Sequence, residues 1–266
     1  MTEPSLIAYG PDPWQEGDLY VPDGEGPHPV VVLIHGGFWR ARWTRDLMDP
    51  LARDLSSSGL AVWNIEYRRI GADGGWPETL RDVAAAVDFL NPVAERYGLD
   101  VGRVVAIGHS AGGHLAGWLG VRARYGCEPE LGGAPVVRPR AIVGLAPVLD
   151  LVEAERRGLG GHAAADFLGG TPETVPERYA TASVAARLPL GIPQVVVHGA
   201  GDDTVPLEMS EAFVAAAIAA GDDARTIALP HADHFSLIDP ESRDWAVARQ
   251  ALMHLLRRGA VRSAPG

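Results

Sequence analysis

Short apolar runs rich in β-branched residues recur along the chain, with helical patterns between them. Residues 30–34 are apolar at every position, as expected for a strand buried on both faces of a parallel sheet. An earlier strand near residues 18–21 is expected to pair antiparallel at one edge. The alternation predicts an α/β fold, a mostly parallel sheet with helices on both faces. The other predicted strands are 60–65, 104–107, 141–145, 194–197 and 225–229.

Prolines mark the expected helix starts. Pro50, Pro77 and Pro240 each stand where a first helical turn tolerates proline. Apolar residues at helical spacing follow the second and third of these prolines, so both helices are expected to pack on the sheet. These residues are Leu80, Val83, Ala84, Val87 and Leu90, and then Ala248, Leu252, Leu255 and Leu256.

The regular alternation is interrupted between about residues 148 and 192. This stretch is rich in Gly, Pro, Glu and Arg, carries only short helical patterns, and is too long for an ordinary connection. We interpret it as a small cap or lid insertion. The whole chain, residues 1–266, is then one domain, which is a usual size for a single α/β domain, with disorder expected only at its ends.

Charge and composition exclude several classes of function. The net charge is −11 and no basic cluster stands out, which argues against a nucleic-acid partner. The chain contains no lysine, which excludes Schiff-base, P-loop and Ser-Lys chemistry. Cys127 is the only cysteine, so neither an intrachain disulfide nor a multi-cysteine zinc site can form.

The start of the chain has no signal-peptide pattern, and no apolar run reaches the ~18 residues of a membrane span. A cytoplasmic protein without membrane attachment is therefore expected. Base rates for oligomers favour a homodimer.

The first chemical motif is Gly-His-Ser-Ala-Gly at residues 108–112, between a predicted strand and a helical stretch. A strand-to-helix turn this tight needs small residues two before and two after the serine. It presents Ser110 at a helix N-terminus, where the dipole favours developing negative charge. We therefore predict that Ser110 is a nucleophile.

A second motif, His-Gly-Gly-Phe-Trp at residues 35–39, follows the most apolar strand. Its glycines allow backbone N–H groups to point into a site and stabilise an oxyanion. We assign this function to the N–H groups of Gly37, Phe38 and Ala111, and assign Phe38, Trp39 and His109 to substrate binding. Trp43 and Trp76 are weaker candidates for the same wall. An ion pair within residues 66–69 is expected to brace this loop.

Two later loops supply an acid and a base. Either Asp202 or Asp203, after the strand 194–197, could orient a histidine, and we favour Asp202. After the last strand, His234 is favoured over His231 as the general base. The order serine, aspartate, histidine differs from that of chymotrypsin-like and subtilisin-like proteases. No motif for catalytic metal binding is found, and no cofactor is expected.

With these residues placed, the chain resembles α/β-hydrolases with a His-Gly-Gly motif over roughly residues 17–257, close to carboxylesterase and lipase-like families. It is also similar to kynurenine formamidases and to bacterial feruloyl and acetyl-xylan esterases. The resemblance implies that Asp202, in the pattern His-Gly-x-x-Asp-x-x-Val-Pro, is the triad acid and that His234, before Phe235, is the base. Phe38 replaces the third glycine of hormone-sensitive-lipase-like proteins, which favours the formamidase-like and feruloyl-esterase-like branches.

The expected function is hydrolysis of small or aryl carboxylic esters, with a small-molecule ester or amide as the only partner. Ser110 would form an acyl-enzyme with His234 as base, so activity should rise with pH as the imidazole, ordinarily titrating near ~6.5, loses its proton. Three alternatives remain open: an arylformamidase acting on N-formylkynurenine, a peptidase trimming short peptides, and a non-catalytic α/β-hydrolase fold that binds a ligand or a partner protein.

Overall fold

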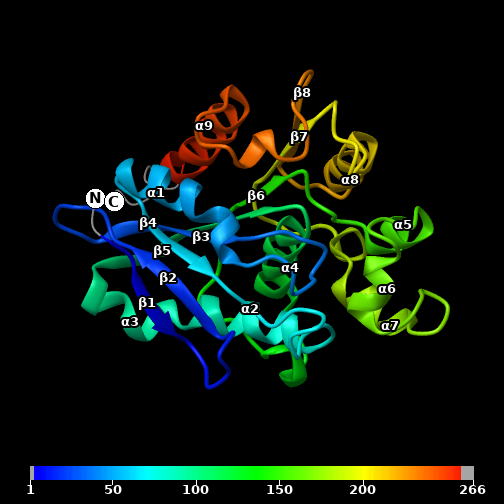
Figure 1. Ribbon diagram of the computed structural model, residues 1–266, viewed down its shortest axis with the longest axis horizontal. Coiled ribbons are helices and arrows are strands. Elements are labelled where there is room, and N and C mark those ends of the chain that lie inside the picture. The colour runs from blue at the N-terminus through cyan, green and yellow to red at the C-terminus, as the bar shows by residue number, and fades with distance from the viewer. Residues whose placement is uncertain (1–2, 259–266) are drawn as a thin grey trace.

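Eight strands form one sheet in the computed structural model, which describes residues 3–258 (Figure 1). The expectation about disordered chain ends concerns residues that lie outside the described ones. Every strand predicted from the sequence is present. The strands are β1 (Ser5–Ala8), β2 (Glu16–Tyr20), β3 (His28–Ile34), β4 (Ala61–Ile65), β5 (Leu99–His109), β6 (Ile142–Leu145), β7 (Gln194–Gly199) and β8 (Ala224–Leu229).

The sheet order is β1-β2-β4-β3-β5-β6-β7-β8, and the strands from β4 to β8 run parallel. The mostly parallel sheet is therefore confirmed. β2 pairs antiparallel with β4 as predicted, but it is not the edge strand, because β1 pairs antiparallel outside it. β1 escaped prediction because it has only four residues and three of them are exposed, which leaves almost no apolar pattern.

Helices cover both faces of the sheet, as predicted. Apolar side chains of α2, α4 and α8 are buried in one core cluster, and those of α1 and α9 in another across the sheet. The helices are α1 (Asp49–Ser57), α2 (Glu78–Asp88), α3 (Leu90–Tyr97), α4 (Ala111–Tyr125), α5 (Leu151–Arg156), α6 (Ala163–Leu168), α7 (Pro176–Ala182), α8 (Leu207–Ala219) and α9 (Arg243–Arg258), and the 3₁₀ turns are η1 (Arg45–Met48), η2 (Pro129–Leu131), η3 (Val184–Arg187) and η4 (Ser236–Ile238).

Two of the three proline-marked helix starts are correct. Pro50 lies in the first turn of α1, and α2 begins directly after Pro77. The third is wrong, since α9 begins at Arg243, three residues after Pro240. Ser242 provides the reason, because its hydroxyl accepts a hydrogen bond from the backbone N–H of Trp245 at 2.9 Å, as an N-cap side chain does.

The stretch interpreted as a cap insertion holds α5, α6, α7 and η3 between β6 and β7. The three helices stand together beside the sheet, coloured green to yellow-green in Figure 1. They contact the loop after β3, where Trp39 stacks on Phe167 with ring centroids 4.8 Å apart and Arg40 pairs with Asp166 at 2.8 Å. The insertion is therefore packed against the loop that carries the His-Gly-Gly motif.

Within the described part of the chain, no helix combines the length and apolar character needed to cross a bilayer.

Candidate active site

Ser110 stands in the sharp turn between β5 and α4. Its backbone has φ 55° and ψ −119°, a strained conformation for a residue with a side chain. The turn is closed by close backbone approaches: a Cβ at Gly108 would lie 2.1 Å from the Gly112 carbonyl oxygen, and one at Gly112 would lie 2.2 Å from that of Ile34. The requirement for small residues two positions before and after Ser110 thus has a direct steric cause.

Asp202 and His234 are brought together by the loops after β7 and β8. The Nδ1 atom of His234 lies 2.6 Å from Oδ2 of Asp202, whose side chain is 0% exposed. Burial acts to raise the pKa of Asp202, but hydrogen bonds from His198, His234 and the Val205 backbone outweigh it and hold the pKa well below the ordinary value. Asp202 is therefore a carboxylate at neutral pH, and it occupies the Nδ1 side of the imidazole.

The alternative candidates for the acid and the base were Asp203 and His231. Asp203 and His231 are both exposed. Within the described residues, the Asp203 side chain has one hydrogen bond, from the Thr204 hydroxyl at 3.2 Å.

His109, the residue before Ser110, contacts His234. Its Nε2 atom lies 2.8 Å from the backbone carbonyl oxygen of His234, so this nitrogen carries the proton and donates it. The two rings are 4.5 Å apart. Burial, with a smaller contribution from the nearby His234, lowers the pKa of His109 to about 3. His109 therefore stays neutral and does not compete with His234 for a proton.

Three backbone donors surround the serine. The N–H groups of Gly37, Phe38 and Ala111 have no hydrogen-bond acceptor within residues 3–258. Gly37 and Phe38 have positive φ values of 106° and 52°, which turn this loop sharply after β3. Ala111 is the first residue of α4, where N–H groups are free and the helix dipole is positive. Free donors next to Ser110 are what stabilisation of an oxyanion requires.

A buried network of charged side chains supports the loop after β3. The Glu66 carboxylate, 0% exposed, lies 2.8 Å from His35 Nε2 and 2.8 Å from the Arg69 guanidinium, so the ion pair expected within residues 66–69 is confirmed. Nδ1 of His35 lies 2.8 Å from the Gly36 carbonyl oxygen. In a trans peptide the N–H points opposite to the C=O, so this contact turns the Gly37 N–H away from the His35 ring.

Burial acts to raise the pKa of Glu66, but the hydrogen bond and charge of His35 and the charge of Arg69 outweigh it and keep the pKa below its ordinary value. The carboxylate thus remains charged beneath the loop.

These groups meet at a cavity of about 160 Å³. His234 and Ser110 face the same space, with His109 and Phe38 beside them. Within residues 3–258 the hydroxyl of Ser110 makes no hydrogen bond, and Nε2 is the ring nitrogen of His234 that Asp202 leaves free. The lining residues are Gly37, Phe38, Trp43, Leu47, His109, Ser110, Thr204, His234 and Phe235.

The assignment of Trp39 to substrate binding is wrong. Trp39 is 1% exposed, stacks on Phe167 of the insertion and donates from its indole to His114, so it belongs to the core. Trp43 and Phe235 line the cavity instead, with ring centroids 6.4 Å apart. For Phe235 a signal existed, since it follows His234 directly in sequence.

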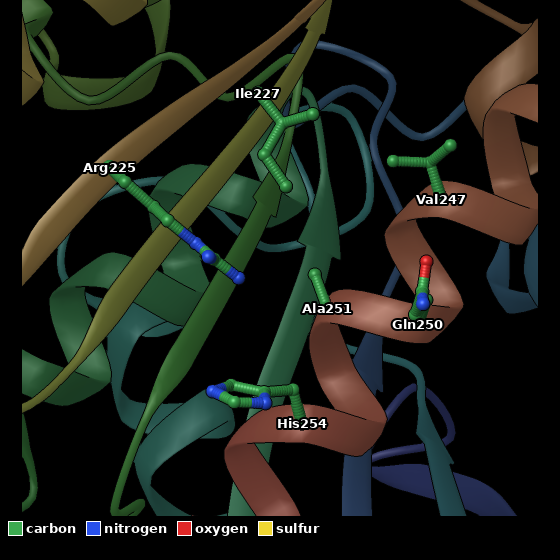
Figure 2. A pocket seen from close by; sticks show the side chains of 6 residues that line it. All are labelled: Arg225, Ile227, Val247, Gln250, Ala251 and His254. Carbon is green, nitrogen blue, oxygen red and sulfur yellow. The ribbon is translucent and has the colours of Figure 1, made fainter.

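A second hollow of about 300 Å³ lies between β8 and α9 (Figure 2). It is lined by Arg225, Ile227, Val247, Gln250, Ala251 and His254. None of these described lining residues is a serine, cysteine or carboxylate, so it offers no hydroxyl, thiol or carboxylate nucleophile. Nor do residues 3–258 contain a group of three His, Cys, Asp or Glu side chains placed to hold a metal ion.

Gly37→Ala should lower kcat by about a hundredfold to a thousandfold, the usual effect of losing one oxyanion donor. At this position φ is 106° and an added Cβ would lie 2.4 Å from Cδ1 of Trp43, so the loop has to shift. Steady-state hydrolysis of p-nitrophenyl acetate measures the loss. Gly59→Ala is the matched control, with φ of 85° and nothing within 4 Å of the new Cβ. Equal activity of the two variants would contradict the assignment.

Comparisons with known proteins agree with this architecture. Residues 18–216 match the family model described as BD-FAE. Among solved structures, esterase B from Lactobacillus rhamnosis superposes with a TM-score of 0.84 at 22% identity, covering 99% of this chain and 90% of that one. A carbohydrate esterase from gut microbiota gives a TM-score of 0.83 at 20% identity, covering 97% of both chains. The fold is that of an α/β-hydrolase.

Sequence relatives point the same way. A probable isoprenylcysteine α-carbonyl methylesterase from Oryza sativa subsp. japonica is 29% identical over 235 residues, covering 83% of this chain and 55% of that protein. Esterase LipC from Mycobacterium tuberculosis is 27% identical over 220 residues, covering 78% of this chain and 53% of that protein. The chain thus spans about half the length of these relatives.

Proposed function

Because the chain belongs to the BD-FAE family of α/β-hydrolases, we propose that it hydrolyses carboxylic esters with short acyl groups. One observation carries the proposal: Ser110 and His234 line one largely apolar cavity together with Gly37 and Phe38, whose backbone N–H groups are free within the described residues. The relatives and solved structures described above are named as esterases, and they give no support to the formamidase alternative.

The chemistry follows from the arrangement. Nε2 of His234 removes the proton of the Ser110 hydroxyl as Oγ attacks the ester carbonyl, and the resulting oxyanion is held by the N–H groups of Gly37, Phe38 and Ala111. His234 then gives its proton to the leaving alcohol, which leaves an acyl-enzyme. Water, deprotonated by the same imidazole, attacks this ester and releases the acid and free serine. Asp202 stabilises the imidazolium in both halves.

The cavity supports a short acyl group. At about 160 Å³ it is smaller than the ~300–1,000 Å³ of pockets that enclose whole drug-sized ligands. The rings of Phe38, Trp43 and Phe235 line it. We therefore assign the acyl group to this cavity and the alcohol part of the ester to the space outside it.

The test is kcat/KM on p-nitrophenyl acetate, butyrate and octanoate, alongside N-formylkynurenine. We expect octanoate to be at least about tenfold poorer than acetate or butyrate, because each methylene that does not fit costs binding in the transition state. A formamide preferred by a hundredfold would replace the proposal with the formamidase alternative. If none of the four turns over and Ser110 does not react with a fluorophosphonate, the fold is non-catalytic.

A further inference from the structure

Asp202 lies between two imidazoles, and the mechanism uses only one of them. The second belongs to His198, near the end of β7, whose side chain is 0% exposed. Its Nε2 atom lies 3.2 Å from Oδ2 of Asp202, the same oxygen that holds His234 at 2.6 Å. One carboxylate oxygen therefore faces both rings.

The contacts of His198 fix which nitrogen carries its proton. Nε2 lies 2.8 Å from the backbone carbonyl oxygen of Val205, which can only accept a hydrogen bond, so Nε2–H is the donor. Nδ1 lies 2.7 Å from the hydroxyl of Ser210 on α8, which donates to it. The N–H of His198 thus points at the Val205 carbonyl with its positive end close to the carboxylate. The ring ties β7, the turn 202–205 and α8 together.

The other carboxylate oxygen is also held. Oδ1 of Asp202 accepts from the backbone N–H groups of Thr204 and Val205 at 2.8 and 2.9 Å. His198 anchors the same turn through a different group, because it binds the carbonyl of Val205. If His198 is lost, the turn that carries both backbone donors loses its side-chain tie to β7 and keeps the backbone hydrogen bond from Asp202 to Gly199.

We infer that His198 is a positioning residue that holds the turn 202–205 and, through Asp202, the orientation and charge balance of His234. The inference rests on the proposed function, because it assigns His198 a part in the same triad. His198 does not line the cavity, so it acts on turnover and not on substrate binding.

The charged and titratable groups around this cluster come from several elements. Glu208 stands in the first turn of α8 and is paired with Arg157 at 3.0 Å. Asp203 and Asp233 are exposed neighbours of Asp202 and His234, and His109 is neutral at the pH of the assay. None of these groups replaces the N–H of His198 beside Oδ2 of Asp202. If His198 is removed, the negative charge of Asp202 therefore interacts with His234 alone among these groups.

The experiment compares His198→Leu with His198→Gln. Leucine fills similar space without a donor, whereas the glutamine amide restores an N–H. For His198→Leu we expect kcat on p-nitrophenyl acetate to fall by about tenfold to a hundredfold, with KM unchanged. The acid limb of the pH profile should move upwards by about 0.5 unit, because His234 then keeps its proton to higher pH. His198→Gln should recover most of kcat and bring the acid limb of the pH profile back to its wild-type position.

Two further variants separate this effect from instability. His114→Leu removes another imidazole that is 0% exposed, hydrogen-bonded to Trp39 and to the Ala182 carbonyl, and it should leave the acid limb in place. Ser210→Ala keeps the His198 ring but frees Nδ1, and it should reproduce part of the kcat loss if His198→Leu does not fold.

The titration of His234 is also read by NMR from its imidazole resonances, assigned with His234→Gln. This readout needs no turnover, so an inactive wild-type protein would overturn the proposed function without deciding the part played by His198. A His198→Leu protein whose His234 titration stays in place or moves downwards, or whose kcat stays within twofold of wild type, overturns the inference.

Discussion

Ser110→Ala is expected to lower kcat for p-nitrophenyl acetate by about a million-fold, leaving only the contribution of binding and of the oxyanion donors. The reason is that no other described side chain is placed to take over the covalent step. Ser110 lines the cavity together with His234, Gly37 and Phe38, and it directly precedes Ala111. Thr204 is the other hydroxyl among the lining residues, and it donates a hydrogen bond to Asp203 at 3.2 Å. Single-turnover and steady-state rates measure the loss.

Ser183→Ala is the matched control for this loss. Ser183 is also buried, but its hydroxyl accepts from the backbone N–H of Leu151 in the insertion, so its loss should lower the melting temperature and spare kcat. A Ser110→Ala protein with near-normal turnover would show that the nucleophile lies elsewhere, whatever the control does.

Asp202→Asn should lower kcat by about ten-thousandfold, the effect of this change in a serine protease triad. An amide that presents its N–H₂ to Nδ1 of His234 stabilises the tautomer with the proton on Nε2, which cannot remove a proton from Ser110. The amide also leaves the imidazolium of the transition state without its counter-charge. Rates are measured above pH 8, where simple protonation of the imidazole does not contribute.

The neighbouring carboxylate offers a control one residue away. Asp203→Asn changes an exposed side chain whose one hydrogen bond within residues 3–258 comes from the Thr204 hydroxyl, so kcat should stay within about twofold of wild type. If Asp203→Asn is the damaging change and Asp202→Asn the mild one, the acid has been assigned to the wrong residue.

How much of the site could be predicted depended on whether its cause was local in the chain. The elbow around Ser110 is partly such a case, because a Cβ at Gly108 would meet the carbonyl oxygen of Gly112, only four residues along the chain. The contact that demands glycine at 112 comes from Ile34, at the end of β3, and only the motif itself indicated it. The sheet could also be predicted, since burial on both faces makes residues 30–34 of β3 apolar at every position. These parts follow from sequence pattern alone.

Features that depend on distant packing were not readable. Trp39 and Trp43 have similar sequence surroundings, yet one stacks on Phe167, 128 positions further along, and the other lines the cavity. His198 and Asp202 are only four residues apart in the sequence. The part that His198 plays beside Asp202, however, depends on its hydrogen bond with Ser210 and on the position of His234 after the next strand. Composition and motif spacing do not predict contacts between residues that are distant in the sequence.

The insertion and the loop after β3 are joined at three consecutive residues. The ring of Phe38 lies so close to Gly160 that a Cβ there would be 2.7 Å from it, Trp39 stacks on Phe167, and Arg40 pairs with Asp166. Phe38 is at once a backbone donor and a wall of the cavity. The cap and the Phe38–Arg40 segment are therefore packed against each other as one unit. A longer cap grafted from another protein of this fold would have to be transferred together with that segment.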